Sequence, residues 1–236
     1  MKRLLPICLA LLAGACGPKP NPPLQGYVEG EYVRVAAPFA GTLVTLDVRR
    51  GQQVASGAAL FALEAENEDA ARREAEERAR RAEALVEDLR KGRRASEIES
   101  VHAQLAQADW RLRQRTVAST VSGTVIDTLF VQGEWVPAGN AVVSLLPPTN
   151  VKVRFFVPQP QLGAVKLGQK VEVACDACGA PIAAQVSFIA PQAEYTPPVI
   201  YSQENRAKLV FLVEARPAEA DAAKLHPGQP VDVRLP

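Results

Sequence analysis

The pattern of hydrophobic and polar positions divides the chain into two kinds of region. Residues 27–64, 116–147 and 150–236 carry short runs in which apolar and polar residues alternate, separated by glycine and proline turns. Residues 66–115 are instead dense in alanine, glutamate and arginine. A period of two is typical of half-buried strands, whereas apolar residues three and four apart are typical of helices. The pattern therefore predicts a mainly β protein with one helical insertion.

The two β segments that flank the insertion are copies of one another. Val35–Leu43 recurs as Val117–Val125, a displacement of 82 positions, and three glycines repeat in the same register: Gly41, Gly51 and Gly57 with Gly123, Gly133 and Gly139. Each copy has too few strands to bury its own apolar face, and two copies are too few for a solenoid. Residues 27–64 and 116–147 are therefore expected to form one small β-sandwich of two interlocking halves.

The inserted residues 65–115 are expected to form an antiparallel coiled-coil hairpin. Two proline-free stretches, 66–91 and 95–115, consist of good helix formers. The second carries an apolar seam with spacings of three and four, made of Ile98, Val101, Leu105, Ala108 and Leu112. At 1.5 Å per residue, about 25 residues project roughly 35–40 Å. The hairpin end is basic and suits docking on acidic helices.

The C-terminal residues 150–236 predict a small antiparallel β-barrel. Val151–Val157 reads as a strong strand, and the pattern Gly-Gln-x-Val-x-Val occurs twice, starting at Gly168 and Gly228. Several short strands separated by Gly and Pro turns are typical of such barrels. Pro230 lies inside the last expected strand, which predicts an edge position for that strand.

Composition argues against enzymatic and nucleic-acid functions. The 236 residues carry a formal net charge of +1, so no bulk electrostatic attraction to nucleic acid is expected. The two histidines, His102 and His226, form no paired metal motif, and no phosphate-binding glycine loop is present in the sequence. We therefore expect no enzyme activity, no cofactor and no bound metal.

The N-terminus reads as a targeting segment. Lys2 and Arg3 precede the apolar run Leu4–Leu12, which is too short to span a bilayer. Ala13-Gly-Ala-Cys16 then resembles a lipoprotein box, although Leu12 lies one place earlier than that motif usually has it. We expect residues 1–15 to be a signal peptide, Cys16 to be lipidated and the proline-rich residues 16–26 to be an extended tether. The alternative is plain secretion with a free Cys16.

Cys175 and Cys178 are the cysteines that remain after this assignment. In an exported protein a Cys-x-x-Cys pair between two strands is expected to be a small disulfide that pins a turn. A redox role is the alternative. One pair alone is a weak zinc signal, because tetrahedral zinc requires four ligands.

The repeated halves resemble a biotinyl/lipoyl-type domain. The cofactor-carrying members of that class have a lysine on the turn between the halves. In this chain the segment after Leu63 contains no lysine before Lys91. The resemblance therefore implies the split sandwich fold without the swinging-arm chemistry.

The order of all the segments resembles the periplasmic adaptor subunits of HlyD-type exporters, also called membrane fusion proteins. The similarity rests on Leu89-x-x-Gly92-x-Arg94-x-x-Glu97-Ile98 at the hairpin turn, on the restart Val117–Val125 and on Ala193–Phe211, which looks like the ABC-exporter branch. It implies a homo-oligomer in the periplasm of a Gram-negative bacterium, anchored to the inner membrane through its lipid. The implied partners are an inner-membrane ABC transporter permease and an outer-membrane channel protein. The channel would meet the hairpin tip, formed by Leu89, Arg90, Gly92, Arg93 and Ser96.

Two other functions remain open from the sequence. The chain ends at Pro236, directly after the expected barrel, whereas adaptors of RND pumps have a further membrane-proximal domain. That favours the ABC partner over an adaptor to another pump class. A structural envelope lipoprotein that serves as a scaffold without a transporter would keep the same stalk and barrel.

Overall fold

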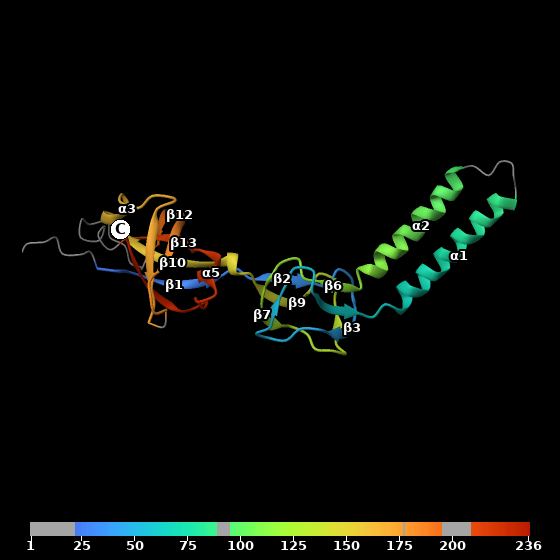
Figure 1. The fold of residues 1–236 in the computed structure, drawn as a ribbon, viewed down its shortest axis with the longest axis horizontal. Helices are drawn as coiled ribbons and strands as arrows, with labels where there is room; N and C mark the ends of the chain where they lie inside the picture. The colour runs from blue at the N-terminus through green and yellow to red at the C-terminus, as the bar shows by residue number, and fades with distance from the viewer. Residues whose placement is uncertain (1–21, 89–94, 177, 195–208) are drawn as a thin grey trace, which may run out of the picture.

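The computed structural model describes residues 22–88, 95–176, 178–194 and 209–236. The described part is elongated, with a β-barrel at one end, two small sheets in the middle and a helical pair at the other end (Figure 1). The mainly β character with a helical pair agrees with the sequence prediction. No helix among the described residues has the length and apolar character needed to cross a bilayer.

The middle unit consists of two four-stranded sheets that each contain strands from both repeats. One sheet has the order β2-β9-β7-β4 and the other β6-β5-β3-β8. The strands are β2 (Val33–Ala36), β3 (Gly41–Leu46), β4 (Gln53–Val54), β5 (Ala59–Leu63), β6 (Thr116–Ala118), β7 (Gly123–Thr128), β8 (Trp135–Val136) and β9 (Ala141–Leu146). Because β4 pairs with β7 and β8 pairs with β3, the two halves interlock. Their shared core includes the fully buried Leu43, Phe61 and Val142.

Six strands close into the barrel in the order β1-β10-β13-β12-β11-β14. They are β1 (Leu24–Gly30), β10 (Val151–Pro158), β11 (Lys170–Ala174), β12 (Ile182–Glu194), β13 (Val210–Pro217) and β14 (Pro230–Arg234). The short helices α3 (Gln159–Leu162), α5 (Glu219–Ala222) and η1 (Pro148–Asn150) connect or flank them. The barrel has its own core, which includes Val153, Phe155 and Val233.

Strand β1 corrects two expected boundaries. Residues 24–26 were expected in the tether 16–26, and residues 27–30 in the sandwich 27–64. Both belong to the barrel, because β1 pairs with β10 through Gly26 and Phe155 and with β14 through Leu24 and Val233. The expected edge position of β14 is also wrong, because that strand pairs with β1 and β11. Pro230 fits since it is the first residue of β14, a position that proline tolerates.

The helical pair consists of α1 (Glu66–Asp88) and α2 (Ala95–Arg113), which run side by side away from the sandwich (Figure 1). Ala75 and Ala79 of α1 are buried. Arg72 of α1 binds Asp109 of α2 with a nitrogen–oxygen distance of 2.8 Å. This hydrogen bond is the main reason that the pKa of Arg72 is raised, so the Arg72 guanidinium stays charged.

Candidate functional site

The base of the helical pair is joined to the sandwich through Arg115. Its Nη1 donates to the carbonyl oxygen of Ala40 at 2.9 Å, and its Nη2 binds the carboxylate of Glu68 at the start of α1. The backbone N–H of Leu63 donates to the Arg115 carbonyl at 2.8 Å. The Arg115 side chain is only 13% exposed. One residue therefore connects both helices to strands of the first repeat.

Two aromatic residues complete this base. The Arg115 guanidinium lies 5.7 Å from the centre of the Phe39 ring, and Trp110 of α2 meets the same ring edge-on at 5.8 Å. Gly41 leaves room for the guanidinium, because a Cβ there would lie 2.9 Å from Arg115 Nη1. The second repeat has Val121 at the position of Phe39. The aromatic residue thus occurs in the half that receives the helices.

The loop between β7 and β8 and the first residue of β8 expose three large apolar side chains. Leu129, Val131 and Trp135 are 50%, 61% and 62% exposed, and we call them the apolar loop. The equivalent positions of the first repeat carry the polar residues Asp47, Arg49 and Gln53. The two loops occupy equivalent places in the two repeats, and the first one folds with polar residues there. Folding alone therefore does not require apolar residues at these positions. The apolar loop is a candidate contact surface.

Four turns in the two β units share one side-chain bond that the sequence analysis missed. In each, a Gln or Glu side chain accepts a hydrogen bond from the backbone N–H three residues earlier, at 2.8–3.1 Å: Gln52, Glu134, Gln169 and Gln229. The residue before each acceptor is a glycine with positive φ, which other residues adopt at a cost. The repeated Gly-Gln was visible in the barrel sequence, and its role is to brace these turns.

Most of the residues expected at the anchor and the hairpin tip lie outside the described part of the chain. These are Cys16, Leu89, Arg90, Gly92 and Arg93. The backbone of Ser96 lies in the first turn of α2. The ends of α1 and α2 that point away from the sandwich lie far from the barrel (Figure 1), and the expected tip lies outside the described residues.

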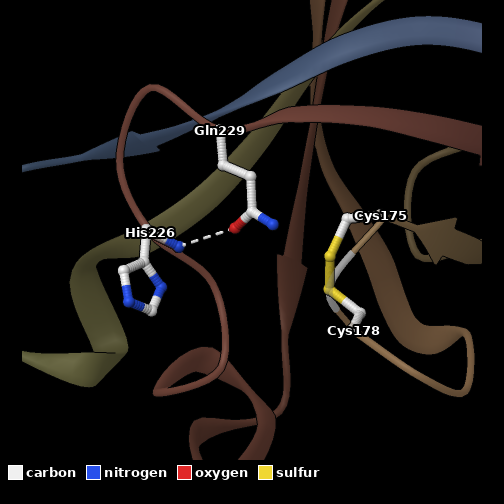
Figure 2. The surroundings of a disulfide bond; sticks show 4 residues. All are labelled: Cys175, Cys178, His226 and Gln229. Carbon is white, nitrogen blue, oxygen red and sulfur yellow. Dashed lines mark hydrogen bonds between the residues drawn. A yellow bond between two sulfur atoms is a disulfide. The ribbon is translucent and has the colours of Figure 1, made fainter.

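Cys175 and Cys178 are joined by a disulfide in the turn between β11 and β12. Both cysteines are half-buried and pack against the barrel core. Figure 2 shows the pair beside the turn that contains His226 and Gln229, where the Gln229 side chain accepts from the His226 backbone N–H. Among the described residues no cluster of His, Cys, Asp and Glu is suited to hold a metal ion.

The chain has sequence relatives among known membrane proteins. No known family profile matches the chain. A UPF0194 membrane protein of Yersinia pseudotuberculosis is 29% identical over 224 residues, which cover 89% of this chain and 68% of the relative. A relative of the same name in Yersinia enterocolitica is 30% identical over 196 residues, covering 80% of this chain and 60% of the relative.

Solved structures show the same fold. A membrane fusion protein from Streptococcus pneumoniae has a TM-score of 0.65 at 20% identity, covering 90% of this chain and 97% of that one. The periplasmic adaptor protein EmrA has a TM-score of 0.58 at 14% identity, covering 89% of this chain and 97% of that one. The chain therefore has the fold of membrane fusion and periplasmic adaptor proteins.

Proposed function

We propose that this protein is the periplasmic adaptor of a tripartite efflux or secretion system. In this proposal it links an inner-membrane, ABC-type transporter to an outer-membrane channel and performs no catalysis. The shared fold with the membrane fusion protein and EmrA supports the class. The segment Ala193–Phe211, with its resemblance to the ABC-exporter branch, supports the choice of transporter.

The observation that carries the proposal is the order of the units along the long axis. Strand β1 begins at Leu24 on the outer end of the barrel, opposite the helices (Figure 1). Cys16 precedes it by eight residues, which span at most roughly 28 Å when fully extended. A lipid on Cys16 would hold the barrel close to a membrane surface and direct the helical pair away from it.

Each unit has a role in this proposal. The sandwich is a lipoyl-type domain that carries no cofactor and serves as a rigid support for the helices. The hairpin tip, with Leu89, Arg90, Gly92, Arg93 and Ser96, meets the helices of the channel. The Cys175–Cys178 disulfide is structural and fits an oxidising periplasm.

We expect the adaptor to work as a homo-oligomer whose copies contact through the apolar loop. Replacing Trp135 with glutamine, the residue at the equivalent position 53, should weaken self-association about tenfold, since buried tryptophans often dominate interfaces. Sedimentation of the purified lipid-free protein measures this. Leu167→Gln is the control, because Leu167 is 67% exposed on the barrel. Equal affinity of both variants would contradict the assignment.

Photo-crosslinking in cells tests the proposed function at both ends of the molecule. A crosslinker at the exposed Glu99, near the N-terminal end of α2 and away from the sandwich, should capture an outer-membrane channel protein. The same group at the exposed Lys170 on the barrel should capture an inner-membrane permease. If neither position captures a transport protein, the chain is instead a scaffold lipoprotein.

A further inference from the structure

Two connecting segments cross the joint between the sandwich and the barrel, and they are bonded to each other. The first joins β1 to β2 and contains Glu31, and the second joins β9 to β10 and contains Asn150. The Glu31 backbone N–H donates to the Asn150 carbonyl at 3.0 Å, and Asn150 Nδ2 donates back to the Glu31 carbonyl at 2.9 Å. The two connections therefore move together as one narrow joint.

A network of charged residues surrounds this joint on the barrel side. Lys152 of β10 has a side chain only 9% exposed, and its Nζ lies 2.7 Å from Glu31, 3.0 Å from Glu214 and 3.4 Å from Glu29. Arg154 pairs with Glu29 and Glu214 at 3.2 and 3.5 Å. Glu29, Lys152, Arg154 and Glu214 belong to barrel strands. Glu31 is the member of the network that belongs to a connection.

Arg216 of β13 reaches both connections. Its Nη1 donates to the carbonyl oxygen of Thr149 in the second connection at 2.8 Å, and its Nη2 lies 3.6 Å from the Glu31 carboxylate in the first. Strand β13 is not directly continuous with either connection. The contacts from Lys152 and Arg216 to Glu31 therefore tie the first connection to two barrel strands, β10 and β13. These side-chain contacts resist bending of the joint in addition to the bonds between the two connections.

We propose that Glu31, held by Lys152 and Arg216, is an electrostatic latch that fixes the barrel in one orientation relative to the sandwich. Opening the latch frees the barrel to turn about the joint while both units stay folded. The barrel tolerates this because Lys152 keeps Glu29 and Glu214 as partners when Glu31 is lost. The latch does not depend on the adaptor role, since all its contacts lie within one chain.

The electrostatics give the direction of the pH response. The hydrogen bond from Lys152 is the main cause that lowers the pKa of Glu31 below its usual 4.5; partial burial opposes this, and Arg216 adds to it. Burial acts to lower the pKa of Lys152, but hydrogen bonds to Glu31 and Glu214 outweigh it and raise that pKa above 10.5. A carboxylate with a lowered pKa contributes fully above its ordinary pKa and loses its contribution as the pH falls through the folded value. The latch is therefore closed above pH 4.5 and opens only as the pH falls through the lowered pKa of Glu31.

Distance measurements between the units test the latch. Spin labels attached after Arg49→Cys in the sandwich and Lys170→Cys in the barrel lie at exposed positions, and the chain without these two changes gives the background signal. At neutral pH the parent protein should give a narrow distance distribution. Glu31→Ala should widen it about twofold, because domains joined by small interfaces move by default. Arg216→Ala should widen it as well.

The matched control is Glu172→Ala, which removes an exposed barrel carboxylate of β11 away from the joint. It should leave the distribution narrow. The far-ultraviolet circular dichroism spectrum of Glu31→Ala must match that of the parent. Lowering the pH through the lowered pKa of Glu31 should widen the parent distance distribution reversibly. A narrow distribution in Glu31→Ala, or loss of its β signal, would overturn the proposal.

Discussion

Replacing Gly26 with alanine is expected to destabilise the protein by about 4 kcal/mol. A Cβ at Gly26 would lie 2.4 Å from the carbonyl oxygen of Arg154 and 2.8 Å from the Cβ of Phe155. Both contacts are on strand β10, the direct partner of β1. Backbone cannot move aside as a flexible side chain does, so β1 must separate from β10 and open the barrel.

Urea unfolding followed by circular dichroism measures this effect. Gly163→Ala is the matched control, because no atom lies within 4 Å of the added Cβ and the backbone φ of −63° suits alanine. We expect that control to be neutral or stabilising by about 0.5 kcal/mol. Equal stabilities of the two variants would show that the close approach of β1 and β10 is not required.

Replacing Arg115 with alanine is expected to destabilise the base of the helical pair by about 3 kcal/mol. The change removes the charge-assisted bonds to Ala40 and Glu68 and leaves the Glu68 carboxylate, which is 18% exposed, without its partner. It also removes the cation above the Phe39 ring. The hydrophobic cores of the sandwich and the barrel do not include these residues, so the loss should remain local.

Hydrogen exchange resolves this local effect. In Arg115→Ala, amides of α1 and α2 next to the sandwich should exchange faster, whereas those of β10 and β13 should not change. Arg113→Ala is the control, because Arg113 is exposed and only two residues away. The proposed role of Arg115 is contradicted if the two variants give the same exchange pattern.

The sequence predicted the two-half sandwich well because the relevant information is local. The glycines of the repeat, such as Gly41 and Gly123, mark equivalent turns and strand starts in both copies. Strand β1 was missed for the opposite reason. It follows a proline-rich stretch, and its partners Phe155 and Val233 lie more than a hundred residues away.

The side-chain contacts of the candidate sites were less predictable. Phe39 could have been found as a departure from the repeat, since Val121 occupies the equivalent position. Glu31 gave no signal, because its partner Lys152 is 121 positions away and exposed glutamates are common. Contacts of this kind form only when distant parts of the chain come together in the fold. The periodicity of apolar and polar residues along the sequence does not encode them.

A membrane pull-down tests the adaptor proposal most directly. A tagged copy of the full chain is compared, after crosslinking in cells, with a variant lacking residues 85–98 at the end of the helical pair. The account predicts that an ABC permease and an outer-membrane channel protein copurify with the full chain, and that the variant loses the channel and keeps the permease. Recovery of neither partner with the full chain, or of the channel with both proteins, would contradict it.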